Sequence, residues 1–264
     1  MSAVNQTETA VLAAFDDAGE LWRIELAGRP TDVVVVDGDL WVSREDGTLA
    51  RIDPSDGRVL GQATIEPFMA VVGGFGSVWA IPGLFDPELS GPGRVVRIDP
   101  NLSTTSVELP RFSGECCPGG PRAGAGAVWV PLGDNGVAVI DPDTNEVTVI
   151  PGDDIGHEVT HIAVDGEVAY VASRHRVASI VDGDVRAGVS PGEIWYLGPM
   201  DGAFGVLGPQ ERFQVLRADN PMVVDVRKIS RGGQSGPVAE VDGEAWMEIG
   251  QNFDLRRVEF ADVP

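Results

Sequence analysis

The sequence predicts an all-β fold made of repeated four-stranded units, and three observations carry this prediction. Gly occurs 34 times and Pro 19 times in 264 residues, as a chain with many short strands and turns requires. The runs between these turns are rich in Val, Ile, Leu and Trp, and none shows the 3.6-residue apolar period of a helix. A Gly-x-x-Trp pattern recurs along the chain, which indicates an internal repeat.

The repeat has the length of one propeller blade. Clear copies of the pattern end at positions 41, 79, 129 and 246, and weaker copies end at 169 and 204. Successive copies are therefore 38, 50, 40, 35 and 42 residues apart. A four-stranded β-propeller blade repeats at roughly 40–45 residues. We therefore expect a single β-propeller domain over residues 1–264 with six four-stranded blades.

A second marker, Ile-Asp-Pro, follows the first in three copies, at residues 52–54, 98–100 and 140–142. A polar corner comes after each copy, and Asp-Pro favours such turns because Pro fixes φ and Asp accepts a hydrogen bond from the backbone ahead. The spacing from Trp to Asp is 12 residues in the first and third copies and 20 in the second. The difference locates an insertion at residues 81–93.

First strands are expected near residues 31–36, 67–72, 120–125, 160–164, 193–198 and 236–241. The run Val33–Val36 does not alternate with polar residues, so we expect this strand to be buried on both faces. The last unit supplies only three strands, and further strands are expected at 10–15 and 20–26. An N-terminal strand joining the last blade would close the ring and remove exposed sheet edges. Seven blades are the alternative, because two N-terminal strands are one more than six blades need.

Two stretches carry a resemblance to known repeats: GSVW followed by GRVVRIDPNLSTTSVELP, and GAVWVPLGDNGVAVIDPDTNEVTVIP. They resemble the bacterial propeller families around virginiamycin B lyase and the YVTN-type propellers, over about residues 20–250. The resemblance implies six or seven blades, with any site on the face where the first strands begin. Virginiamycin B lyase opens a cyclic lactone with a catalytic His and a metal held by acidic groups. No stretch of this sequence matches that set, so the activity is not carried over.

The net charge and the sequence composition limit the kinds of partner that this protein can bind. The 41 acidic and 19 basic residues give a net charge of −22, which argues against nucleic acid and anionic membrane surfaces. No apolar run reaches the roughly 18 residues of a membrane helix, and the first ten residues lack the features of a secretory signal. We expect a cytoplasmic protein whose partner is a small molecule or another protein.

A propeller blade has two ends. The loop face carries the loops leading into each first strand and the loops between second and third strands, whereas the turn face carries the two other sets of turns. The segments 81–93 and 110–121 are enlarged, and both are expected on the loop face together with 151–161. Enlarged loops on a rigid scaffold often carry function, although insertions are also tolerated on surfaces without one.

The histidines are the candidate catalytic residues. Residues 157–161 read HEVTH, which matches a zinc-protease motif, but that motif requires a helix and the flanking sequence predicts strand and turn. On a strand the two His would lie roughly 13 Å apart, too far for one metal. We instead expect His157, Glu158, His161 and His175 to cluster on the loop face of one blade as acid–base residues. Solvated or hydrogen-bonded histidines are the alternative.

Other polar residues of the loop face are candidates for ligand binding. The adjacent Cys116 and Cys117 can form a strained vicinal disulfide or hold a soft metal, or stay reduced and idle. Carboxylates could work in pairs or hold a divalent metal ion, and arginines could hold an anionic ligand. The full set is Arg44, Asp86, Glu88, Cys116, Cys117, Asp134, Arg174, Arg176 and Glu193.

Two functions therefore compete. The first is a binding or scaffold propeller that presents a ligand or partner site at the channel mouth. The alternative is a small-molecule lyase, cyclase or hydrolase with a His- and carboxylate-containing site on the same face. The sequence has neither a nucleophile elbow nor a phosphate-binding Gly loop, and a fold does not by itself determine a function. A narrow acidic pocket that contains a perturbed His would favour the enzyme, whereas a flat surface with an exposed apolar patch would favour a partner protein.

Overall fold

The computed structural model describes residues 9–16, 19–66, 68–82, 93–112, 120–174, 176–189, 196–200, 203–208, 212–217, 223–228, 235–241, 244–249 and 254–258. The chain divides into two compact units, residues 1–109 and 110–264, and each is described by itself. Within the described ranges the structure is all-β apart from the four-residue helix α1 (Gly152–Ile155), as predicted. None of the described helical residues forms a segment long and apolar enough to cross a membrane. A single domain over residues 1–264 stays a prediction.

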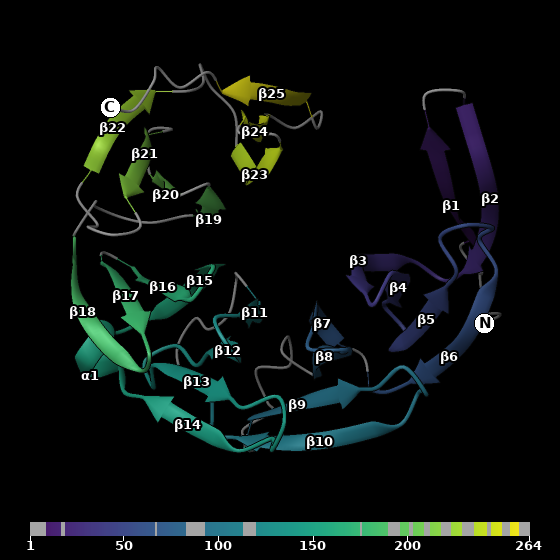
Figure 1. Ribbon diagram of the computed structural model, residues 1–264, viewed down its shortest axis with the longest axis horizontal. Helices are drawn as coiled ribbons and strands as arrows, with labels where there is room; N and C mark the ends of the chain where they lie inside the picture. Colours follow the sequence, from purple (N-terminus) through teal and green to yellow (C-terminus); the bar gives the residue numbers. More distant parts are fainter. Residues whose placement is uncertain are drawn as a thin grey trace, which may run out of the picture. The chain divides into compact units, whose positions relative to one another are not determined.

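The first unit contains one hairpin and two four-stranded antiparallel sheets, in which strands pair in chain order (Figure 1). The hairpin is β1 (Thr9–Asp16) and β2 (Gly19–Ala27). The first sheet is β3 (Pro30–Val36), β4 (Asp39–Arg44), β5 (Thr48–Ile52) and β6 (Val59–Thr64). The second sheet is β7 (Phe68–Gly74), β8 (Ser77–Pro82), β9 (Gly93–Ile98) and β10 (Thr104–Leu109).

The second unit contains three four-stranded sheets and one three-stranded sheet, again paired in chain order. The first two are β11 (Arg122–Gly124), β12 (Ala127–Pro131), β13 (Val137–Ile140) and β14 (Val147–Ile150), then β15 (Val159–Asp165), β16 (Val168–Ser173), β17 (Val177–Val181) and β18 (Asp184–Val189). The last two are β19 (Tyr196–Met200), β20 (Ala203–Gly208), β21 (Arg212–Arg217) and β22 (Val223–Lys228), then β23 (Ser235–Val241), β24 (Glu244–Ile249) and β25 (Asp254–Val258).

The first strands of consecutive sheets pack against each other inside each unit. In the first unit β3 contacts β7, and in the second β11 contacts β15, β15 contacts β19 and β19 contacts β23. These strands overlap the six predicted ranges, so the predicted repeat is confirmed. Glycine permits the close approach: a Cβ on Gly73 would lie 2.7 Å from the carbonyl oxygen of Val35, and one on Gly124 would lie 2.7 Å from Cγ1 of Val164.

In its first three copies, the Gly-x-x-Trp pattern spans the hairpin turn between first and second strands. In three copies the two turn residues both have positive φ, for example 54° at Phe75 and 68° at Gly76, which suits the twist of a two-residue hairpin. The indole of Trp79 donates to the carbonyl of Gly74 at 3.2 Å, and that of Trp129 donates to Gly124 at 2.9 Å. The predicted burial of Trp41, Trp79 and Trp129 is confirmed, at 1%, 0% and 4% exposed. The side chain of Trp246 lies outside the described side chains.

The expectation that the run Val33–Val36 is buried on both faces is wrong. Val36 is buried and Val34 packs against the same core, whereas Val33 and Val35 are 45% and 61% exposed. Successive side chains of a strand point to opposite faces, and the core that β3 shares with β7 and β8 covers only one of them.

The β1–β2 hairpin covers the opposite face of the same sheet at β4 and β5. Trp22 and Leu26 pack against Val42, Ala50 and Ile52, and the Trp22 indole donates to the carbonyl of Pro54 at 2.7 Å. Among the described strands, β1 and β2 pair only with each other. Both N-terminal strands lie where the sequence predicts them.

Candidate functional site

The HEVTH segment is not helical. Helix α1 ends at Ile155, His157 and Glu158 lie in a bend, and His161 lies on β15. The geometry of a zinc-protease helix is therefore absent, as expected from the flanking sequence. His157 is exposed, with its Nε2 3.2 Å from Oδ1 of Asp153. Glu158 pairs with Arg174 at 3.5 Å, and both side chains are about half exposed.

His161 has a different environment. Its side chain is buried, and Nδ1 shares a hydrogen bond of 2.9 Å with the hydroxyl of Thr160. Burial, together with the positive charge of Arg122, lowers the pKa of His161 to about 4. At neutral pH this imidazole is uncharged and a weak base, whereas a catalytic base works best with a pKa near the operating pH.

The described ligand-binding candidates make local contacts. Arg44 is buried, its guanidinium donates to the carbonyl of Ala27, and its Nε lies 3.9 Å from Asp46, so it links β2 to β4. Arg174 is held by Glu158, Arg176 is half-buried and Asp134 is exposed. That these residues bind a ligand stays a prediction. The remaining candidates lie outside the described residues: Asp86, Glu88, Cys116, Cys117, His175 and Glu193. Among the described residues no group of three or more His, Cys, Asp or Glu side chains could hold a metal ion.

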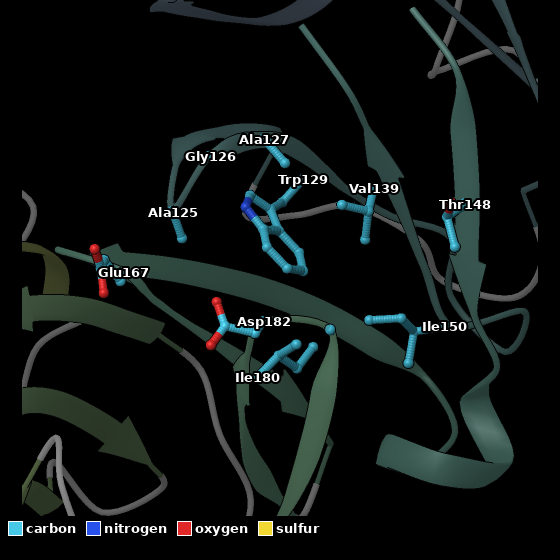
Figure 2. Close-up of a pocket in the computed structure, with 11 residues that line it drawn as sticks. Ala125, Gly126, Ala127, Trp129, Val139, Thr148, Ile150, Glu167, Ile180 and Asp182 are labelled. Carbon is cyan, nitrogen blue, oxygen red and sulfur yellow. The ribbon is translucent and has the colours of Figure 1, made fainter.

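A pocket of about 510 Å³ opens between the sheet β11–β14 and the sheet β15–β18. Buried side chains of Trp129, Ile150 and Ile180 form its apolar part, and Glu167 and Asp182 stand at its rim. Figure 2 shows the indole of Trp129 projecting toward Ile180 and Asp182, with Val139 beside it. The volume lies in the range of small-ligand pockets, which combine apolar walls with a few placed polar groups.

Among the described residues, the rim of the pocket carries negative charge without a balancing cation. Glu167 lies in the turn between β15 and β16, and Asp182 lies with Gly183 in the turn between β17 and β18. Within the described part of the chain, neither carboxylate has a hydrogen-bond or ion-pair partner, and no Lys, Arg or His lines the pocket. Because these turns join first to second and third to fourth strands, the pocket lies on the turn face, opposite the face singled out from the sequence.

The sequence reasoning missed this pocket, although a signal for it exists. The residue before Ile-Asp-Pro is Arg51 in the first copy and Arg97 in the second, but Val139 in the third. Each of these residues is the cross-strand partner of its repeat's Trp. The arginine side chain present at the first two copies is therefore missing beside Trp129, where the pocket lies.

Comparisons with known proteins identify the fold. No family model matches the chain, and no curated protein matches it. The β-propeller domain of Cps50 (Swd1) from Myceliophteria thermophila superposes with a TM-score of 0.66 at 9% identity, covering 94% of this chain and 88% of that one. The chain has the β-propeller fold.

Two further propellers of bacterial origin are similar over most of the chain. Apo AztD from Citrobacter koseri gives a TM-score of 0.64 at 10% identity, covering 91% of this chain and 74% of that one. BamB from Moraxella catarrhalis gives 0.59 at 12% identity, covering 92% and 80%. At such low sequence identity, the structural similarity shows the fold alone, because one fold is used for many functions. The predicted propeller is confirmed, while the resemblance to virginiamycin B lyase and YVTN-type propellers stays a prediction.

Proposed function

We propose that this propeller is a binding protein that takes a positively charged ligand or partner and carries out no chemistry on it. The observation that carries the proposal is the pocket between the blades β11–β14 and β15–β18, where two carboxylates without partners in the described residues border an apolar wall. Unpaired carboxylates beside an apolar surface favour a cation that neutralises them. The net charge of −22 also attracts cationic partners at long range.

The enzyme alternative would use His157, Glu158, His161 and His175 on the loop face. His161 has a pKa of about 4, so its imidazole is a weak base at neutral pH, and His157 is exposed to solvent beside Asp153 rather than enclosed in a pocket. The described walls of the pocket contain no histidine. These observations favour binding over catalysis.

The proposal is tested by titrating the protein with a short Arg- and Lys-rich peptide and with a Glu-rich peptide of equal length. We expect the basic peptide to bind, with an affinity that falls as salt rises, and the acidic peptide not to bind. Calorimetry measures both, and mass spectrometry of the recovered peptide checks that it is unchanged. Equal binding of the two peptides, or turnover that is lost in His157→Gln or His161→Gln, would contradict the proposal.

We also propose that one N-terminal strand, from the β1–β2 hairpin, joins β23–β25 to complete the last blade and close a six-bladed ring. Three observations on the described residues support this closure: the last sheet has three strands, β1 and β2 pair only with each other, and Val33 and Val35 on β3 are exposed. Closure would give the free edge of β25 a partner. Hydrogen exchange tests this, because closure protects every amide of β25, whereas an unpaired edge protects only those that bond to β24. Fast exchange of the alternate amides would rule closure out.

A further inference from the structure

We infer that the pocket beside Trp129 receives a guanidinium group, the head of an arginine side chain presented by a partner peptide. This inference rests on the proposed binding function and names the ligand of that same pocket. The inference comes from a comparison of blades within this chain, because each of the first two blades has an arginine of its own beside the repeated Trp.

The first blade shows how that guanidinium is held. Arg51 lies over the ring of Trp41, with its guanidinium carbon 5.7 Å from the ring centroid. Its Nε donates to Oδ2 of Asp39 at 2.5 Å, and a terminal nitrogen donates to the carbonyl of Pro100 at 2.6 Å. Pro100 lies in the turn between β9 and β10, the third and fourth strands of the next blade. The guanidinium therefore spans from a Trp on one blade to the third-to-fourth turn of its neighbour.

The second blade repeats the stack. Arg97 lies over Trp79 at 5.2 Å, and its Nε donates to Oδ1 of Asp99 at 2.9 Å and to the hydroxyl of Ser77 at 3.1 Å. In both blades the arginine is the cross-strand partner of the Trp, and a polar residue two positions before the Trp accepts a hydrogen bond from it. Stacking on the indole and hydrogen bonding at the guanidinium edge thus recur together.

The third blade has the Trp but has neither the cross-strand arginine nor the polar residue two positions before the Trp. Val139 occupies the cross-strand position, and Ala127 stands two residues before Trp129. Both replacements are small and apolar, so the space that an arginine side chain fills in the other blades is open here. The third-to-fourth turn of the neighbouring blade carries Asp182, so a carboxylate borders the pocket from the turn that supplies the Pro100 carbonyl in the first blade pair.

The chemistry of the pocket selects a guanidinium over other head groups. A guanidinium is planar and weakly hydrated, stacks on an indole, and donates along its edge to carboxylates. Asp182 and Glu167 line the pocket and can accept such hydrogen bonds, and Figure 2 shows Asp182 on the side toward which the indole projects. An ammonium can neutralise the carboxylates but stacks less well, and an anion is repelled. Free arginine carries its own carboxylate, so a capped arginine within a peptide fits better.

The experiment is an NMR titration that follows the indole N–H signals of the six Trp residues. The probes are N-acetyl-arginine amide, N-acetyl-lysine amide, free arginine, and N-acetyl-citrulline amide as the uncharged isostere. We expect the capped arginine to shift the signal of Trp129, with a dissociation constant on the order of 1 mM for so small a probe. Citrulline should bind about tenfold more weakly, and lysine and free arginine should lie between the two.

Two pairs of variants locate the site. Val139→Arg places an arginine of the chain itself in the pocket, and this substitution should abolish binding of the probe. Asp141 lies two residues after position 139, just as Asp99 lies two residues after Arg97 and accepts a hydrogen bond from it. Val149→Arg is the matched control, because Val149 is exposed on the opposite face of β14 from the pocket residues Thr148 and Ile150. Asp182→Asn should weaken binding about threefold to tenfold, and Asp184→Asn should leave it unchanged. Asn suits position 182, whose φ is 51°.

The outcomes separate this inference from the proposed function. Equal binding of arginine and citrulline overturns the guanidinium assignment. Binding that survives Val139→Arg overturns the assignment to this pocket while leaving a cation-binding propeller intact. If no cationic probe or basic peptide binds, both proposals fail. Thermal melts check each variant, and if Val139→Arg does not fold, the comparison of Asp182→Asn with Asp184→Asn decides the inference by itself.

Discussion

At the residue scale, His161 makes stability depend on pH. Its pKa is about 4 in the folded chain against 6.5 for an ordinary histidine, because burial and Arg122 disfavour the charged form. Between these values the unfolded chain binds more protons, so stability rises with pH and is fully present above about 6.5. We expect acidification from neutral pH to pH 4 to remove about 3 kcal/mol through this residue.

Urea denaturation across this pH range measures the effect. His161→Gln should flatten the dependence, whereas His157→Gln is the matched control, since that imidazole is exposed. An unchanged slope in His161→Gln would show that this residue does not cause the dependence.

The repeated Trp is a packing residue in the described blades. Trp79 is fully buried, and we expect Trp79→Ala to lower the free energy of unfolding by about 3–5 kcal/mol through lost burial and the cavity left behind. Trp79→Phe should cost less, because an aromatic ring is kept. Chemical denaturation measures both, and a cost below about 1 kcal/mol for the Ala variant would contradict this role.

The same residues show what could be predicted. The Trp positions follow from the repeat, because a Trp at the same position of four repeats is explained by packing between sheets. The pocket could not be found that way: Arg51, Arg97 and Val139 stand before the same Ile-Asp-Pro marker, and the sequence alone does not show what this position contacts. Only the register shows that this position faces the Trp, and Asp182 looks in the sequence like an ordinary turn former.

At the element scale, close approach of the first strands depends on glycine. A Cβ at Gly73 would meet backbone at 2.7 Å, from the carbonyl oxygen of Val35, and backbone cannot move aside cheaply. We expect Gly73→Ala to lower the melting temperature by several degrees. Gly61→Ala is the matched control, since its nearest neighbour at 2.6 Å is a methyl of the flexible Leu102 side chain. Equal melting temperatures for the two variants would show that the strands can separate.

The positions of the strands are predictable from the sequence, whereas which faces of the strands are buried is not. Turn residues and β-branched runs place the six first strands within a few residues, because strand propensity and turn chemistry are local. Which face of β3 is covered depends on what packs there, so the run Val33–Val36 does not by itself show which of its side chains are buried. The insertion at residues 81–93 and the enlarged loop at 110–121 drew attention to the loop face, whereas the pocket formed where side chains are smaller and loops are short.

At the scale of the whole molecule, charge opposes compaction. The net charge of −22 produces self-repulsion in the folded state that the more expanded unfolded chain relieves. The described ion pairs act in the other direction, but most are exposed and contribute little. Repulsion among many carboxylates therefore exceeds the attraction of a few pairs, and screening both should stabilise the fold.

We expect the melting temperature at neutral pH to rise by several degrees between about 0.01 M and 0.5 M sodium chloride, where the Debye length falls from about 30 Å to a few Å. Calorimetry measures the shift, and the same scan near pH 4 is the control, because partial protonation of the carboxylates removes most of the repulsion. A melting temperature that falls with salt at neutral pH would mean that ion pairs outweigh the net charge.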